Sequence, residues 1–209
     1  VALARAMVIK PNLLLLDEPL SNLDAKMREE MQIELRRIQR TVGTTMILVT
    51  HDQAEAMALS DRVVIMNKGK VEQVAAPQDA YDNPASAFVA NFLGRTNLLQ
   101  GTVRHDGGAA RIDVAGTAWP VGPNLPAGPG VLTVRPEKVS FVDGAGVSGL
   151  VQARVFQGTQ WLFEIKTEAG PLTVIRQHDG QVLPAENERV TVGWRAEDMR
   201  VMSGSVGGA

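Results

Sequence analysis

The stretch Leu13-Leu14-Leu15-Leu16-Asp17-Glu18-Pro19 decides how the first half of this chain folds. Four consecutive leucines indicate a short strand that is buried on both faces of a parallel sheet. Met46-Ile47-Leu48-Val49 has the same character. Between the two stretches, apolar residues recur every three or four positions from Asp24 to Val42, with Gly43 available to end a helix. The pattern therefore predicts two buried strands joined by an amphipathic crossover helix.

Polar side chains follow both predicted strands at the point where each strand ends. Asp17 and Glu18 come after the first strand, and His51 comes shortly after the second. Open α/β sheets bind their ligands at the carboxyl ends of the strands. A buried carboxylate needs a cation or hydrogen-bond donors, and phosphate-bound Mg²⁺ would satisfy Asp17. Glu18 could then act on a water as a general base, an effect of about 100- to 10,000-fold, and His51 could donate to a phosphate.

Simpler interpretations of these residues remain open at this point. The acidic pair could be a solvated strand end, and a single histidine is more often structural than catalytic. Asp24 and Asp52 each precede a predicted helix, and an aspartate side chain in that position accepts hydrogen bonds from the amides of the first turn. Capping by Asp24 is compatible with a second, functional role.

The chain changes character near residue 94, which divides it into two expected domains, 1–93 and 94–209. A short helix over Gln53–Leu59 and a hairpin that turns at residues 67–70 complete the first, α/β domain. After the boundary lie eighteen of the twenty glycines and all three tryptophans. Apolar residues there recur at every second position, which is typical of half-buried strands. We expect an all-β domain, a small antiparallel barrel or sandwich.

The apolar residues at alternating positions of the second half mark the expected buried faces of its strands. They are Val151, Ala153 and Val155, then Trp161, Phe163 and Ile165, then Leu172 and Val174, then Val190, Val192 and Trp194. The three tryptophans, Trp119, Trp161 and Trp194, could stack on a ligand, but a small barrel needs aromatic mass in its core, and we favour that interpretation.

Composition excludes several classes of function. The chain of 209 residues carries 21 basic and 23 acidic residues, a formal net charge of −2, which argues against a nucleic-acid partner. It contains no cysteine, so disulfides and thiolate metal sites are excluded and a reducing cytoplasm is compatible. The apolar run at Leu13–Leu16 falls far short of the roughly 20 residues that span a bilayer.

Over residues 13–24 and 49–61 the sequence resembles the ATP-binding subunits of ABC transporters. Residues 13–19 look like the Walker B strand, Ser21-Asn22-Leu23-Asp24 like the D-loop, and Thr50-His51-Asp52-Gln53 like the switch-histidine region. The resemblance implies ATP and Mg²⁺ as cofactors, with Asp17 holding Mg²⁺ through water, Glu18 polarising the attacking water and His51 sensing the γ-phosphate. It also implies that the D-loop residues Ser21 and Asp24 act at the nucleotide across an ATP-sandwiched homodimer.

The resemblance extends through the second half and is specific to bacterial importers. Residues 61–69 and 88–94 fit the importer branch, while Arg135-Pro136-Glu137 and Trp194 look like an appended OB-fold-like TOBE domain. Such subunits are found in importers of polyamines, ferric iron, sugars and some oxyanions. The amino-acid sequence of residues 88–99 most resembles the importers of polyamines or ferric iron. The implied partners are transmembrane permease subunits, a second copy joined through both domains, and indirectly an external solute-binding protein. The implied location is the cytoplasmic face of the inner membrane, and a DNA- or ribosome-directed ABC ATPase is disfavoured.

Three family motifs are missing from the sequence. No segment fits Gly-x-x-x-x-Gly-Lys-Ser/Thr, because Gly69-Lys70 is followed by Val71, and neither the serine-glycine-glycine signature nor the glutamine loop is present. We therefore expect a chain truncated at its N-terminus that neither binds ATP tightly nor hydrolyses it. We also expect the loss of the P-loop strand to expose an apolar edge of the sheet, which favours strand exchange or dimerisation. The alternative function is a regulatory β module that binds a small ligand or a protein.

Overall fold

The computed structural model describes residues 5, 6, 8, 9, 11–106 and 109–204. It divides into two compact units, one ending at Ala85 and the other beginning at Ser86. Within these residues, the first unit is α/β and the second is all-β apart from α5 and two short 3₁₀ helices. The predicted fold class, an α/β part followed by an all-β part, is confirmed.

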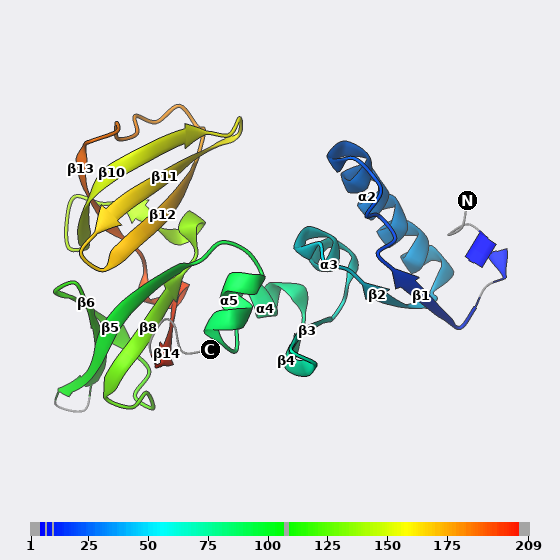
Figure 1. Ribbon diagram of the computed structural model, residues 1–209, viewed down its shortest axis with the longest axis horizontal. Coiled ribbons are helices and arrows are strands. Elements are labelled where there is room, and N and C mark those ends of the chain that lie inside the picture. The colour runs from blue at the N-terminus through cyan, green and yellow to red at the C-terminus, as the bar shows by residue number, and fades with distance from the viewer. Residues whose placement is uncertain (1–4, 7, 10, 107–108, 205–209) are drawn as a thin grey trace. The chain divides into compact units, whose positions relative to one another are not determined.

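The first unit is built on a parallel pair of strands, β1 (Leu13–Asp17) and β2 (Thr45–Val49), joined through α2 (Ala25–Val42) (Figure 1). Both ends of α2 follow the predicted signals. The Asp24 carboxylate accepts a hydrogen bond from the Met27 amide, and Gly43 ends the helix with a φ of 71°, a left-handed conformation that glycine adopts without steric cost. The predicted βαβ unit is confirmed.

In the described residues of this unit, the strand pair is followed by α3 (Gln53–Leu59), the hairpin of β3 (Val63–Asn67) and β4 (Lys70–Ala75), and α4 (Pro77–Asp82). The helix α3 has the predicted bounds. The hairpin turns through Lys68 and Gly69, which both have positive φ, of 47° and 77°. Two consecutive residues of this kind match the right-handed twist of the flanking strands.

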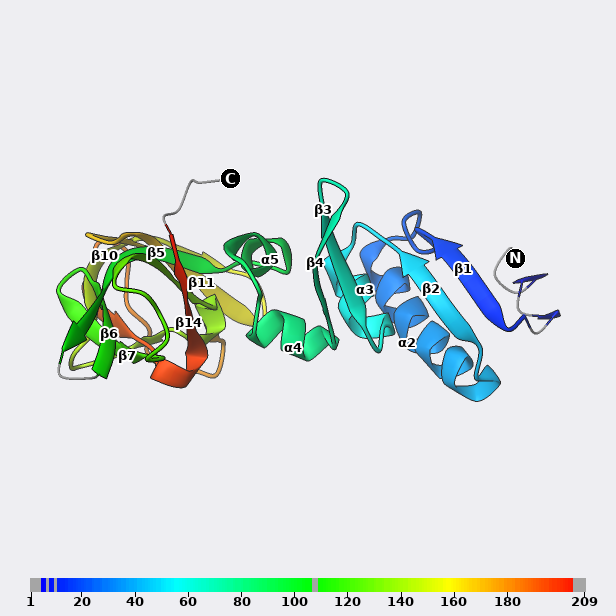
Figure 2. The same ribbon diagram turned by 90° about the horizontal axis from the view of Figure 1, so that it is seen from below.

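The prediction that the strands of the first unit are buried on both faces is wrong. Leu14 is 6% exposed, but Leu13, Leu15, Ile47 and Val49 are 48 to 67% exposed. The reason is that side chains alternate between the faces of a strand, and α2 runs along one face only (Figure 2). Within the described residues, the opposite face of β1 and β2 therefore presents apolar side chains to solvent.

This exposed face predicts self-association of the chain. Light scattering on a concentration series should show dimers or larger species, because contiguous apolar patches of this kind are uncommon on soluble monomers. The double variant Leu15→Lys, Ile47→Lys should shift the population toward monomer. Val182→Lys is the matched control, since Val182 is fully exposed in the other unit. Monomer alone at high concentration would contradict the prediction.

As far as the structure describes it, the second unit contains two curled antiparallel sheets of five strands each. One sheet has the order β14-β8-β5-β6-β7 and the other β12-β11-β10-β13-β9. The bounds of the first sheet's strands are β5 (Asn97–Asp106), β6 (Ala109–Val114), β7 (Thr117–Val121), β8 (Gly128–Val134) and β14 (Met199–Ser203). Those of the second are β9 (Ser140–Phe141), β10 (Val147–Phe156), β11 (Gln160–Thr167), β12 (Gly170–Gln177) and β13 (Arg189–Gly193). Three further elements complete the unit: α5 (Ala87–Phe92), η1 (Pro136–Lys138) and η2 (Ala196–Asp198).

The core of this unit lies between the two sheets and draws residues from both. Trp119 is 8% exposed and stacks on Trp194 with ring centroids 4.6 Å apart, which confirms the core interpretation for this pair. Val155, in contrast, is 47% exposed, so its place in the predicted core is wrong. A register shift in β10 between Val151 and Ala153 breaks the alternation there.

One buried amide links the two sheets. The Asn97 side chain, on β5, accepts a hydrogen bond from the Thr173 amide (2.6 Å) and donates one to the Thr173 carbonyl (2.8 Å). Thr173 lies on β12, an edge strand of the other sheet, so Asn97 pairs backbone groups that no neighbouring strand takes up. Asn97 is 4% exposed, and the geometry uses both ends of its amide.

Removal of this amide should destabilise the β unit. Asn97→Ala leaves the part-buried Thr173 amide and carbonyl without these partners, and an unsatisfied group costs up to about 1–3 kcal/mol when it is fully buried. Urea denaturation should show a lower midpoint for this variant. Gln100→Ala, a truncation at an exposed position of the same strand, should change the midpoint little. Equal midpoints for the two variants would show that the Asn97 bonds contribute nothing.

The helix α5 belongs to the second compact unit, which begins at Ser86. Arg135, which is 6% exposed, explains this association. Its guanidinium donates to the carbonyl of Ala90 at 2.8 Å and to those of Gly94 and Arg95 at 3.4 and 3.2 Å. A cation that satisfies the carboxyl-terminal carbonyls of a helix fixes that helix to the segment that carries the cation, here the residue between β8 and the next 3₁₀ helix.

Candidate functional site

The candidate site lies at the carboxyl end of the β1–β2 pair. In the parallel register Asp17 is opposite Val49, so the residues that follow both strands emerge at the same edge. The pairing continues one residue further, because the Glu18 amide donates to the Val49 carbonyl at 2.8 Å. Asp17 itself is exposed.

Glu18 and His51 meet at this edge. His51 Nε2 lies 3.4 Å from Glu18 Oε1, and their side chains are 89% and 45% exposed. Ser21 lies in the turn after β1, where its hydroxyl donates to the Glu18 carbonyl at 3.0 Å. Asp24 caps α2 instead of reaching the pair. The structure thus brings together Glu18, His51 and, through the backbone, Ser21.

The backbone at Glu18 is in an unusual conformation. Its φ of 43° lies in the left-handed region, which residues with a Cβ rarely adopt. Such strain persists where surrounding bonds enforce it, and it is concentrated at functional sites. Here the enforcing bonds are those of the Glu18 amide to Val49 and of the Ser21 amide and hydroxyl to the Glu18 carbonyl.

The loop that carries His51 is held by the residues on either side of it. The Thr50 hydroxyl donates to Glu55 Oε2 at 2.6 Å and accepts from the Asp52 amide at 3.0 Å. Asp52 caps α3 by accepting from the Glu55 amide at 3.1 Å. Its other carboxylate oxygen is 2.9 Å from Arg28 Nη1. Asp52 therefore does serve as a helix cap, in addition to its ion pair.

Sequence reasoning missed Glu55 and Arg28 as parts of this site, and it named Thr50 within the switch-histidine region without giving it a role. The spacing Asp52-x-x-Glu55 is a capping-box pattern and could have drawn attention to Glu55. In this structure the Glu55 carboxylate binds the Thr50 hydroxyl in place of the backbone at the helix start. Arg28 lies 24 residues before Asp52, and no sequence signal connects the two.

A pocket of about 600 Å³ opens at this edge. It is lined by Glu18, Ser21, Arg28, Thr50, His51, Asp52, Gln53, Ala54 and Glu55. The lining offers carboxylates, an imidazole and hydroxyls, which suit a water or a metal-bound phosphate. It holds no glycine-rich loop for a triphosphate, and the described residues form no cluster of three potential metal ligands. The pocket therefore fits one side of a Mg²⁺–nucleotide site and not the whole of it.

Comparisons with known proteins show which sequences this chain is similar to. Residues 132–202 match the TOBE domain family. The spermidine/putrescine import ATP-binding protein PotA of Aster yellows witches'-broom phytoplasma is 40% identical over 208 residues, which are 97% of this chain and 48% of that protein. The Fe(3+) ions import ATP-binding protein FbpC of Brucella melitensis is 39% identical over 207 residues, 97% of this chain and 58% of that protein.

The chain is homologous to the C-terminal half of the PotA and FbpC ABC importer ATP-binding proteins. PotA 2 of Pseudomonas aeruginosa is 48% identical over 182 residues, 81% of this chain and 50% of that protein. This chain thus spans about half the length of the curated relatives it matches. Among solved structures, the cytoplasmic molybdate-binding protein ModG superposes at a TM-score of 0.42 with 15% identity, over 50% of this chain and 94% of that one. That superposition is too loose to add to the account of the fold.

None of the helices in the described ranges is both long and apolar enough to cross a membrane.

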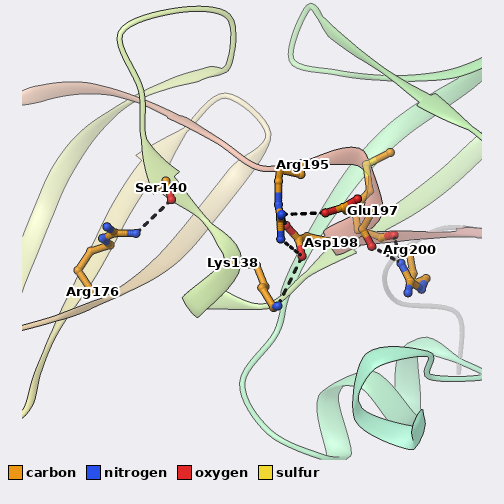
Figure 3. A network of polar contacts seen from close by, with 8 residues as sticks. Lys138, Ser140, Arg176, Arg195, Glu197, Asp198 and Arg200 are labelled. Carbon is orange, nitrogen blue, oxygen red and sulfur yellow. Dashed lines mark hydrogen bonds and ion pairs between the residues drawn. The ribbon is translucent and has the colours of Figure 1, made fainter. Parts of the chain in front are cut away.

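The TOBE part of this ABC protein homologue carries a second polar cluster (Figure 3). Arg195 donates from Nε to Asp198 Oδ2 at 2.7 Å and contacts Glu197 at 2.8 Å, while Lys138 Nζ lies 3.5 Å from Asp198. The cluster joins η1 to η2. It is a structural tie, because the Asp198 side chain is only 9% exposed and is occupied by these partners.

A pocket of about 320 Å³ also lies in the TOBE part, bounded by Phe141, Arg176, residues 181–184 and Glu188. The Arg176 guanidinium donates to the Ser140 hydroxyl at 3.1 Å, so part of its hydrogen-bonding capacity is used within the fold (Figure 3). The lining of this pocket supplies one guanidinium, one carboxylate, one amide and several apolar groups, a less distinctive set than that at the β1–β2 edge.

The Asp198 cluster predicts a pH dependence of stability. Hydrogen bonds from Arg195, aided by the charges of Arg195 and Lys138, hold the pKa of Asp198 below its usual value, although burial raises it. A lowered pKa in the folded state stabilises the fold above the unfolded pKa of about 3.9, and this contribution is lost as the pH falls toward the folded value.

Asp198→Asn should therefore lower Tm at pH 7, and the difference from the unsubstituted chain should shrink below about pH 4. Thermal unfolding followed by circular dichroism across pH 3–7 measures both. Asp106→Asn, at an exposed position on β5, is the matched control. A difference in Tm that is the same at all pH values would contradict the role assigned to the charge of Asp198.

Proposed function

We propose that this chain is the C-terminal half of the ATP-hydrolysing, energy-coupling subunit of a bacterial ABC importer. The observation that carries the proposal is the meeting of Glu18 and His51, 3.4 Å apart, at the carboxyl edge of two parallel strands. The homology to importer ATP-binding proteins supports it over nearly the whole chain.

Each site residue has a proposed role that follows from its chemistry and place. Glu18 is the general base that accepts a proton from the attacking water, and its 45% exposure leaves room for that water. His51 donates a hydrogen bond to the terminal phosphate, and its contact with Glu18 orients the imidazole. Asp17 holds Mg²⁺ through water, while Ser21 and Asp24 act at the nucleotide of a second copy.

These residues supply the reacting side of the site but little of its binding. Phosphoryl transfer depends mainly on positioning and electrostatic stabilisation of the phosphates, which a glycine-rich loop and its lysine provide. That loop does not occur in the sequence. We therefore propose that the 209 residues alone do not hydrolyse ATP, and that ATP and Mg²⁺ bind when the phosphate loop is supplied by additional sequence.

The proposed partners and location rest on the same homology to importer ATP-binding proteins. The relatives are named for import of spermidine and putrescine or of ferric ions, and we propose a polyamine or ferric iron as the transported solute. The subunit would then work as a homodimer, through both of its parts, on permease subunits at the cytoplasmic face of the inner membrane. A solute-binding protein outside that membrane would deliver the solute.

The test compares ATP turnover with and without the missing loop. The purified chain should show no turnover above background. A fusion to the upstream half of a PotA relative should hydrolyse ATP, and Glu18→Gln in that fusion should reduce kcat by at least about 100-fold, since a general base is worth 10²–10⁴. Glu30→Gln, at an exposed position of α2, is the matched control and should leave kcat unchanged.

Turnover by the 209-residue chain that disappears in Glu18→Gln would overturn the proposed inactivity of the chain alone. A fusion in which Glu18→Gln and Glu30→Gln are equally active would overturn the role of Glu18 as the base.

A further inference from the structure

We infer that Arg28 is a positioning residue that couples the turn after β1 to the loop that carries His51. This inference rests on the proposed function for its catalytic meaning, although the coupling itself can be measured without ATP. Arg28 lies in the first turns of α2 and was not assigned any role by the sequence motifs.

His51 depends on its neighbours for its position. Its side chain is 89% exposed, and in the described part of the chain the polar group within reach of its imidazole is the Glu18 carboxylate. A side chain this exposed does not fix its own location, because rotamers of exposed residues interconvert on the ps–ns timescale. The backbone of the loop must therefore hold the imidazole near Glu18.

Arg28 reaches both segments that define the site. Its Nη1 is 2.9 Å from Asp52 Oδ2, next to His51 in the chain, and its Nη2 donates to the Leu23 carbonyl at 3.1 Å. Leu23 belongs to the turn after β1, where the Leu23 amide donates to the Leu20 carbonyl at 3.1 Å. Two nitrogens of one planar group thus join a loop after β1 to a loop after β2.

The far side of the His51 loop is fixed by buried groups, which makes the Arg28 contact effective. Glu55 is 2% exposed, and its carboxylate accepts a hydrogen bond from the Thr50 hydroxyl. That hydroxyl in turn accepts a hydrogen bond from the Asp52 amide. Asp52 cannot move away from Arg28 without breaking its cap on α3. Arg28 and Asp52 are themselves 31% and 29% exposed in their side chains, so their ion pair is partly shielded from water and salt.

The geometry also explains why the residue is an arginine. The two contacts diverge from one guanidinium to a carboxylate and to a carbonyl. Lysine has a single nitrogen at the end of a flexible stem and would not hold both acceptors in one fixed orientation. Arg28→Lys should therefore retain part of the attraction to Asp52 but lose the coupling.

Amide hydrogen exchange of the 209-residue chain, followed by NMR, tests the coupling directly. Arg28→Met should speed exchange of the Asp52 amide, and Asp52→Asn should speed exchange of the Leu23 amide, each by roughly 5- to 30-fold, the range that corresponds to one or two kcal/mol. Asp52→Asn keeps a side-chain oxygen that can cap α3. The double variant should show no more than the larger single effect, because the two residues act through one contact.

Arg37→Met is the matched control, since Arg37 lies on the same helix in an exposed pair with Glu34 and should leave both amides unchanged. The inference is overturned if each substitution alters only its own segment, or if the two effects add in the double variant. It is also overturned if exchange accelerates equally throughout β1, β2 and α2, because that pattern reports general destabilisation.

A kinetic test then connects the coupling to catalysis. In the active fusion, Arg28→Met should lower kcat about tenfold and change KM for ATP less than twofold, because the loop is misplaced while the phosphate-binding part is intact. Arg28→Lys should give a kcat close to that of Arg28→Met. Unchanged kcat together with altered exchange would overturn the positioning role. A fusion without any turnover would instead contradict the proposed function. The hydrogen-exchange result would still test the coupling, because it is measured without ATP.

Discussion

The parallel pairing of β1 with β2 is the constraint on which the site depends. It places Asp17 opposite Val49, so that the chain leaves both strands at the same edge of the sheet. The residues that follow each strand therefore lie close to one another. A shift of the register by one residue would turn every side chain to the opposite face. The bond from the Glu18 amide to the Val49 carbonyl extends the pairing beyond the last strand residue and, with the Ser21 bonds to the Glu18 carbonyl, holds the left-handed backbone at Glu18.

The site is therefore assembled from backbone geometry first and side-chain contacts second. Glu18 and His51 are both substantially exposed, and neither is anchored by packing. Their arrangement comes from the turns on which they lie, and those turns are held by Ser21, Thr50, Asp52 and Arg28. The β unit is stabilised differently. An apolar core lies between its two sheets, and buried polar side chains such as Asn97 and Arg135 form hydrogen bonds that join its elements.

Much of the local structure follows from the sequence, because the signals involved act over a few residues. The Asp24 cap, the Gly43 stop, the bounds of α3 and the glycine turn of the hairpin are of this kind. The long-range features are different. The bonds between Arg28 and Asp52 and between Asn97 and Thr173 join residues 24 and 76 positions apart, and no local pattern indicates them. The exposed face of β1 and β2 and the bulge that exposes Val155 also depend on which elements surround a strand, information that periodicity does not contain.

The most direct test of the central claim is a crystal structure of the active fusion with Mg²⁺ and a non-hydrolysable ATP analogue. We expect Asp17 opposite Val49, the His51 imidazole within hydrogen-bonding distance of the terminal phosphate, and the Glu18 carboxylate facing a water in line with that phosphate. A structure in which β1 and β2 pair in another register, or in which Glu18 and His51 lie on different sides of the nucleotide-binding part, would contradict it.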